Sequence, residues 1–198
     1  MNTKLNRILF SAFLVSALLV CSCKKKEQAV SPPVPGNEFI TTIKWHFVNV
    51  NNPADTLWAR WYQDPNGTLP PDTSHAIVNL KKNATYNMSV HIYDESQNPA
   101  VDITNEIAVQ RANYHLYFFF ESGGLVSSTG TKHIIITATD HDTNNPPLPI
   151  GMQDKWVTDT TTCSGRVEGV LRHQPNSKNG TFAPGSSDSD VFFTVNIN

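Results

Sequence analysis

Regular alternation between apolar and polar residues is the feature that most restricts how this chain can fold. Residues 85–93 read TYNMSVHIY and residues 191–197 read VFFTVNI, so that every second side chain in each segment is apolar. Successive side chains of a strand point to opposite faces, and this pattern therefore predicts strands that bury one face. The chain is expected to build a core from sheets.

The same reading predicts about eight strands along the chain. They fall at residues 39–47, 56–62, 75–80, 85–93, 114–121, 132–140, 166–174 and 191–197. Clusters of glycine, proline, asparagine and aspartate separate many of them, and these residues suit chain reversals. Residues 104–112 lack turn residues and predict one short helix, which Thr104 or Asp102 could cap. We therefore expect an all-β fold, an antiparallel, immunoglobulin-like β-sandwich with a single short helix.

The first 26 residues have the order of an export signal. A basic start is followed by an apolar run from Ile8 to Val20 and then by two cysteines and three lysines. About 13 apolar residues are fewer than the roughly 20 that span a bilayer, so a transmembrane anchor is the weaker reading. The segment resembles a bacterial lipoprotein signal, which implies cleavage after Ser22 and acylation of Cys23. Cys21 is the alternative lipid site, although the branched Val20 before it fits a signal peptidase poorly.

These features divide the chain into three parts. Residues 1–22 are predicted to be the signal peptide, residues 23–36 the lipidated cysteine with a proline-rich tether, and residues 37–198 one β-sandwich domain. The domain carries ten lysines and arginines against sixteen aspartates and glutamates, a formal charge of −6. This charge argues against nucleic acid as a partner. Cys163 is the one cysteine of the domain, so no disulfide is expected within it.

Histidine is the first candidate for chemistry. Three of the seven histidines lie in expected strands among apolar neighbours and are the metal candidates: His115, His133 and His173. Imidazole binds zinc and copper well, but no two histidines have a spacing that brings them together locally. A metal site would need assembly across strands, and hydrogen-bonded histidines at a sheet surface are the plainer alternative.

An acidic loop is the second candidate. Asp140, Asp142 and Asn144 place oxygen ligands at alternate positions, as a calcium loop begins. The sixth position is Asn145 instead of glycine, and the twelfth is Gly151 instead of glutamate. Turns stabilised by Asp and Asn side chains explain the segment equally well.

Catalytic motifs are missing from the sequence, and aromatic residues offer a binding surface instead. The chain has no Gly-x-Ser-x-Gly elbow and no phosphate-binding loop, so we expect no enzyme, although a hydrolase stays open. Trp58 and Tyr62 share one face of a strand and Trp61 takes the other. One of these faces could bind a sugar or a partner, and packing on both sides is the alternative.

Several phrases resemble a family of small Bacteroidota-type lipoproteins of unassigned activity. They are residues 37–42 (NEFITT), 83–90 (NATYNMSV), 94–107 (DESQNPAVDITNEI), 148–151 (LPIG), 171–175 (LRHQP) and 178–181 (KNGT). The relatives often carry a complete Asp-x-Asp-x-Asn-Gly loop where this chain has residues 140–145. The resemblance implies a place near outer-membrane receptors of the TonB-dependent kind.

Two functions are expected from these observations. The first is a lipid-anchored, non-catalytic binding or accessory lipoprotein at the outer membrane, without a cofactor beyond its acyl chains, palmitate among them, and with an outer-membrane receptor as a candidate partner. The alternative is a periplasmic lipoprotein that handles zinc or copper through its strand histidines. The sequence leaves open the side of the membrane that the domain faces.

Overall fold

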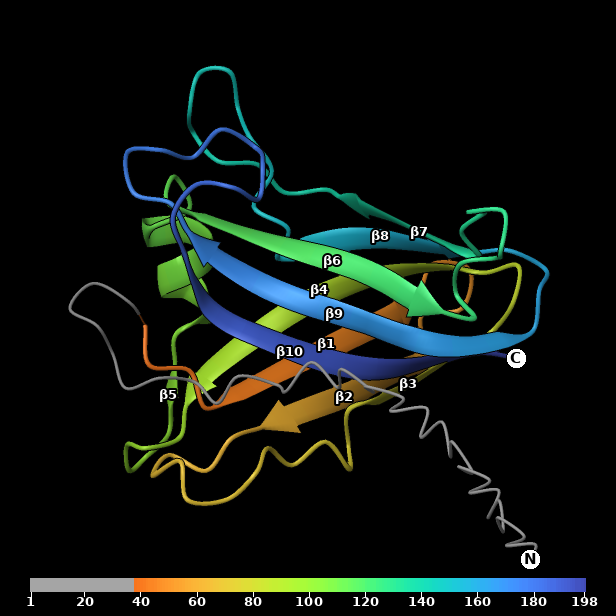
Figure 1. Ribbon diagram of the computed structural model, residues 1–198, viewed down its shortest axis with the longest axis horizontal. Helices are drawn as coiled ribbons and strands as arrows, with labels where there is room; N and C mark the ends of the chain where they lie inside the picture. The colour runs from red at the N-terminus through yellow and green to blue at the C-terminus, as the bar shows by residue number, and fades with distance from the viewer. Residues whose placement is uncertain (1–37) are drawn as a thin grey trace, which may run out of the picture.

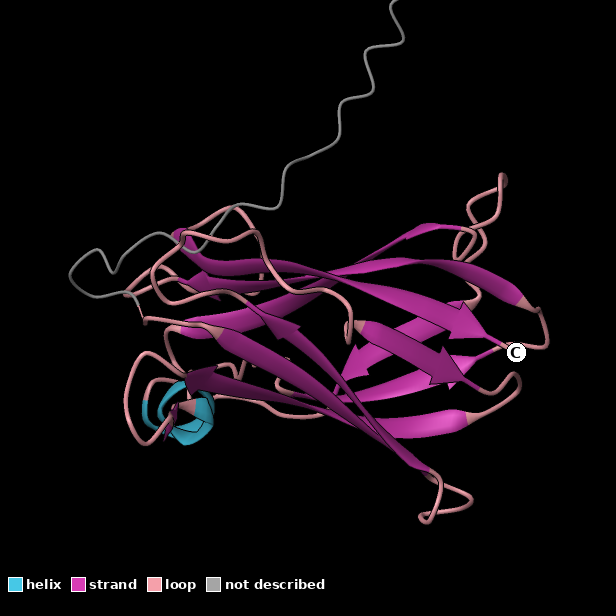
Figure 2. Ribbon diagram, turned by 90° about the horizontal axis from the view of Figure 1, so that it is seen from below, coloured by secondary structure: helices cyan, strands magenta, loops and turns pink. Residues whose placement is uncertain are grey.

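The computed structural model describes residues 38–198, which form an all-β sandwich of two sheets and confirm the predicted fold class. Figure 1 shows strands β6, β9 and β10 side by side in front of β1 and β4, and Figure 2 shows the same layers from below. The strands are β1 (Thr42–Asn49), β2 (Thr56–Tyr62), β3 (Ile77–Leu80), β4 (Thr85–Asp94), β5 (Val101–Asp102), β6 (His115–Gly123), β7 (Ile134–Ala138), β8 (Gln153–Thr158), β9 (Cys163–His173) and β10 (Ser186–Ile197).

One sheet has the order β2-β1-β4-β8-β7, with β5 paired to β4, and the other has the order β3-β10-β9-β6. All pairs between these strands are antiparallel except β3 with β10, which is parallel. This one parallel pair is the exception in the predicted antiparallel sandwich. Strand β3 is joined to the sheet by the last strand of the chain, and this pairing needs a long connection.

Two of the ten strands were not predicted. Strand β5 has only two residues. Strand β8 turns Asp154, Trp156 and Thr158 inward, so that two of its three buried side chains are polar. A strand whose inner face is polar lacks the alternation on which sequence reading depends.

The core between the sheets is aromatic at its centre. Trp45 stacks on Phe193 with ring centroids 3.7 Å apart, and the edges of Phe119 and Trp156 meet it at 5.4 and 5.6 Å. Trp45 and Phe193 come from β1 and β10, one in each sheet. These ring contacts therefore stabilise the packing of one sheet on the other.

The predicted short helix is present in a reduced form. A single π-helical turn, η1, spans Glu106–Gln110 and buries Ile107. Asp102 Oδ1 accepts a hydrogen bond from the backbone N–H of Thr104 at 2.9 Å, just ahead of the turn. The turn lies at the end of the sandwich where β6 begins (Figure 1).

Gly169 on β9 leaves no room for a side chain between Tyr117 of its own sheet and Trp45 of the other sheet. A Cβ atom there would lie 2.4 Å from the Tyr117 hydroxyl oxygen and 2.8 Å from a ring carbon of Trp45. We expect Gly169→Ala to lower the free energy of unfolding by about 1–3 kcal/mol through overpacking, measured by urea denaturation. An unchanged midpoint would mean that the aromatic rings move aside without strain.

The predictions for the first part of the chain lie outside the described residues. They concern the signal peptide of residues 1–22, the lipid on Cys23 or Cys21, and the tether of residues 23–36. Within residues 38–198, no helix is long and apolar enough to cross a membrane.

Candidate metal centre

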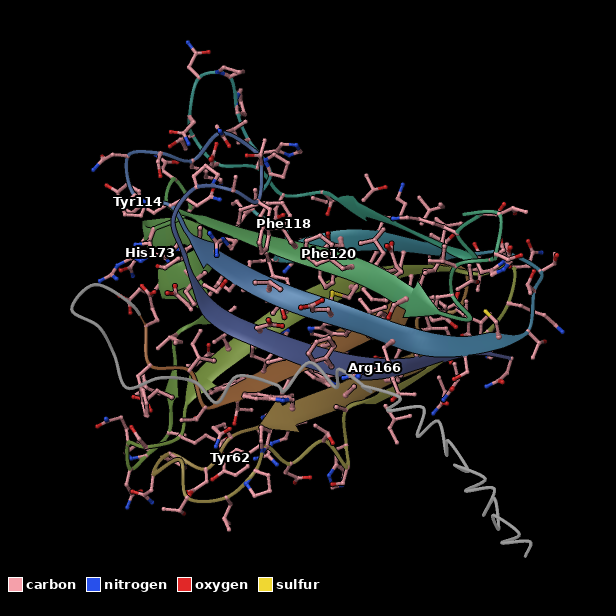
Figure 3. The ribbon with its side chains drawn as sticks, in the orientation of Figure 1. Tyr62, Tyr114, Phe118, Phe120, Arg166 and His173 are labelled. Carbon is pink, nitrogen blue, oxygen red and sulfur yellow. The ribbon has the colours of Figure 1, made fainter. Side chains whose placement is uncertain are left out.

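Four metal-ligating side chains meet inside one end of the sandwich: Glu38, His115, His173 and Asp188. One ligand atom from each can be chosen so that all four atoms lie within 4.8 Å of one another. The side chains of Glu38, His115 and Asp188 are 5, 0 and 0% exposed, and His173 is also buried. Figure 3 places His173 at the end of the sandwich that carries the helical turn. The cluster is therefore a largely buried polar site.

Strand register brings the two histidines together. His115 on β6 and His173 on β9 are directly opposite each other in the antiparallel ladder, so their side chains share one face. Their rings stack with centroids 4.8 Å apart and an angle of 19° between the planes. The pair lies on the inner face, in line with the buried Tyr117 and Leu171.

A β-bulge brings in the third residue. The pairing of β10 with β9 shifts between Ser187 and Ser189, so Asp188 is an extra residue without a partner in the ladder. Bulges redirect side chains beside functional sites. Here the bulge allows Asp188, which is 6% exposed, and its neighbour Ser189 both to be buried.

Glu38 completes the cluster from the segment ahead of β1. Glu38 Oε2 lies 3.1 Å from His115 Nε2, and Glu38 Oε1 accepts a hydrogen bond from Arg111 at 2.6 Å. Arg111 in turn lies 2.9 Å from Glu106 of the helical turn. The helical turn thus holds the guanidinium that orients the first carboxylate.

The orientation of the His115 ring is fixed by the backbone. Its Nδ1 lies 3.1 Å from the carbonyl oxygen of Arg111, which can only accept, so Nδ1 carries a proton. Its Nε2 then faces Glu38 Oε2 at 3.1 Å and Asp188 Oδ2 at 3.3 Å. Metal-ligating histidines typically donate their second N–H to a carbonyl or carboxylate in this way.

Asp188 is a buried carboxylate with few polar contacts. Its Oδ2 faces His115 Nε2 at 3.3 Å, and no donor reaches its Oδ1 in good alignment. Burying a carboxylate with incomplete hydrogen bonding is costly. A cation between Asp188, Glu38 and the imidazoles would satisfy it.

Each charged group of the cluster shifts the pKa of its neighbours. Burial favours the neutral form of Glu38, but hydrogen bonds with His115 and Asp188 outweigh it and lower its pKa to about 2. Burial likewise opposes the charge on His115, but Asp188 and Glu38 raise its pKa to about 9. Burial raises the pKa of Asp188 to about 6, with Glu38 adding to the effect and His115 opposing it. In the absence of metal, a proton on His115 compensates the carboxylates.

The residue types fit a zinc ion, although the four ligand atoms, which spread over as much as 4.8 Å, would have to draw closer around it. Zinc takes histidine nitrogen and carboxylate oxygen at about 2.0–2.2 Å, which places neighbouring ligand atoms roughly 3.3–3.5 Å apart. The two contacts of His115 Nε2, at 3.1 and 3.3 Å, are close to this spacing. A divalent cation would neutralise the two negative charges of Glu38 and Asp188. The positive charge of Arg111 is already offset by Glu106, with which it also forms an ion pair.

The structure brings together two of the three histidines singled out from the sequence. His133 lies just before β7, where its Nδ1 is 2.7 Å from Asp159 Oδ2 and its backbone N–H bonds Leu125, beyond the far end of β6. His115 is at the start of that strand, so His133 does not belong to the same site. Within residues 38–198, the four-residue cluster is the one group of three or more such side chains whose donors converge.

The oxygen ligands of the acidic loop are engaged by donors of the protein. The Asp140 carboxylate accepts backbone hydrogen bonds from Gly151, Met152 and Gln153 at 2.9 to 3.1 Å. Asp142 accepts hydrogen bonds from Asn144 and Leu148, and Lys178 Nζ lies 2.7 Å from its Oδ2. This geometry is that of a turn held by Asp side chains and a buried ion pair.

Glu38 and Asp188 were missed by the sequence reading. Asp188 lies in the run SSDSD at residues 186–190, just before the alternation of residues 191–197 begins. A run of polar residues next to an alternating segment is predicted to lie beyond the end of the strand. The bulge that turns one of these residues inward interrupts the alternation, so the sequence pattern does not indicate it. Glu38 precedes the first strand and has no pattern of its own.

Comparisons of the chain with protein-family models, with curated proteins and with solved structures found no match.

Proposed function

We propose that the protein is a lipid-anchored, non-catalytic lipoprotein of the cell envelope whose domain binds a divalent transition metal, zinc foremost, through Glu38, His115, His173 and Asp188. The observation that carries the proposal is the convergence of four potential ligand side chains, among them the buried and incompletely hydrogen-bonded Asp188 carboxylate. Two of these residues are among the candidates for the metal-handling alternative, and that alternative is favoured on this ground.

The closed site favours binding over catalysis. Structural zinc sites use four protein ligands, whereas catalytic sites keep one position open for water or substrate. The four side chains here are almost wholly removed from solvent. An ion held by all four would have no free position that a substrate can reach.

The position of the ligands gives the metal a mechanical role. Glu38 belongs to the first described segment, and the other three ligands come from β6, β9 and β10 of the four-stranded sheet. An ion at this point would fasten the start of the domain to that sheet. If residues 23–36 are the membrane tether, the metal would hold the tether where it enters the domain.

The test is metal content in the full chain purified in mild detergent. We expect near-unit zinc after dialysis against micromolar zinc, and less than about a tenth of that in Asp188→Asn and in His173→Gln, because each loses a ligand. Elemental analysis and competition with a colorimetric chelator give the stoichiometry and the affinity. Zinc bound by cysteines elsewhere in the chain is the same in every variant, so differences in zinc content between variants report on the cluster.

His133→Gln is the matched control, since it removes a histidine that also faces a carboxylate but lies outside the cluster. It should bind as much zinc as the parent. Circular dichroism of each variant checks that the sandwich is intact. Full zinc binding by Asp188→Asn, or none by the parent chain, would contradict the proposal.

A further inference from the structure

A second, independent feature lies on the outer face of the β2-β1-β4 part of the larger sheet. The register aligns three rows of side chains across these strands. The middle row is Arg60, Lys44 and His91, one neighbouring row is Trp58, His46 and Ser89, and the other is Tyr62, Thr42 and Tyr93. Most of these side chains alternate with buried core residues and so point away from the core.

Trp58 is the most exposed part of this surface. Its indole is 52% exposed, although it stacks on His46 at 4.0 Å between ring centroids with only 10° between the planes. His46 is itself held by a 2.8 Å hydrogen bond between its Nε2 and Thr56 Oγ1. One face of the indole therefore packs on His46, and His91 lies 5.0 Å away, so these rings position the indole before any ligand arrives. Such preorganisation reduces the entropic cost of binding.

Two cationic side chains lie in the row next to Trp58 and His46. Lys44 and Arg60 are directly opposite each other on β1 and β2, an arrangement that is unfavourable between like charges. Lys44 Nζ lies 4.4 Å from the Tyr93 ring centre, and the Arg60 guanidinium lies 4.5 Å from that of Tyr62. Carboxylates also lie near these cations: Asp72 is close enough to interact with Arg60, and Asp102 and Glu95 act on Tyr93.

The side chains line a groove of suitable size. It has a volume of about 490 Å³ and is lined by Lys44, Trp58, Ala59, Arg60, His75 and Tyr93. Small-molecule sites usually measure about 300–1,000 Å³ and combine aromatic walls with a few polar groups. The groove is broadly open to solvent.

We infer that this groove binds an acidic oligosaccharide, with a sugar ring against Trp58 and a uronate carboxylate between Lys44 and Arg60. An indole face suits the flat, apolar face of a pyranose, and the paired cations select a negative charge. The carboxylate would also relieve the repulsion between the two cations. Neutral sugars would gain only the stacking contact.

One protein carboxylate competes for this position. Glu95 Oε2 lies 3.3 Å from Arg60, and both side chains are about one-third exposed. Such a pair is weak and screened by solvent. A ligand carboxylate can therefore displace Glu95, and removal of Glu95 should strengthen binding of acidic sugars alone.

The experiment is calorimetric titration of the full chain in detergent with a trimer of galacturonic acid and, separately, a trimer of glucose. The acidic trimer should bind at least tenfold more tightly, with an affinity that falls as salt rises. We expect Trp58→Ala to weaken binding of the acidic trimer more than tenfold. Lys44→Gln should remove the preference for it, and Glu95→Gln should tighten its binding severalfold.

Phe120→Ala is the matched control because Phe120 is 41% exposed on β6 of the other sheet (Figure 3). It should leave binding unchanged. The inference is overturned if neither trimer binds at millimolar concentration, if both bind equally, or if Trp58→Ala binds the acidic trimer as the parent does. The metal content of the variants is a separate measurement, so this result and the zinc result can fail independently.

Discussion

Zinc at a thousandfold excess over its dissociation constant is expected to raise the melting temperature of the protein by roughly 8–16 °C. A ligand that binds only the folded state at that excess adds about 4 kcal/mol, and 1 kcal/mol corresponds to roughly 2–4 °C for a domain of this size. The physical reason is the buried Asp188 carboxylate, whose hydrogen bonding is incomplete although an imidazole faces it at 3.3 Å. Differential scanning calorimetry with and without chelator measures the shift.

Three controls make this result specific. Asp188→Asn should lose most of the zinc-induced shift, while His133→Gln should keep it, since His133 pairs with Asp159 outside the cluster. Magnesium should have little effect, because it prefers an octahedral shell of oxygen ligands. A shift of equal size in parent and Asp188→Asn would place the zinc elsewhere.

The fold class was readable from the sequence because the strands are amphipathic. The alternation in β4 and β10 survives in the structure as inward rows such as Met88, Val90 and Ile92. Where the inward side chains are polar, as Asp154 and Thr158 are on β8, the strand was not recognised. Periodicity thus records apolar burial, and it is blind to polar residues that the fold buries for other reasons.

The candidate site was only half readable for a related reason. His115 and His173 were identified from their apolar neighbours, but nothing in the sequence states that these two residues are paired across β6 and β9. Register is a long-range property, fixed by turns and core packing of the whole sheet. His133 has an equally apolar context, and the topology places it at the other end of β6.

A buried carboxylic acid on β8 is expected to make the protein less stable as the pH rises. Asp154 is 3% exposed, and its Oδ2 is buried without a hydrogen bond. Burial raises the pKa of Asp154 to about 8, and the negative charge of Asp140 adds to the effect. The folded state therefore keeps a proton that the unfolded chain releases near pH 4.

The sign of the pH effect follows from this difference in proton binding. The stabilising contribution of the neutral acid is fully present below about pH 4 and is lost as the pH rises to about 8. At 1.36 kcal/mol per pKa unit, the loss from Asp154 is on the order of 5 kcal/mol at most. Asp154→Asn, which stays neutral throughout, should therefore gain stability relative to the parent between pH 5 and pH 8.

Urea denaturation of both proteins at several pH values tests the prediction. The quantity to compare is the difference between the unfolding free energies of the two proteins, because His115 and Asp188 also have raised pKa values that contribute to the pH dependence of both.

Asp159→Asn serves as the control of opposite sign. A hydrogen bond with His133 first, and then one with Thr161, lowers the pKa of Asp159, so removal of its charge should cost stability above pH 4. If the parent and Asp154→Asn ran parallel from pH 5 to pH 8, Asp154 would be ionised in the folded protein. A donor would then have to reach its carboxylate through the adjoining cavity of about 220 Å³, which Tyr117, Phe119 and Ile136 also line.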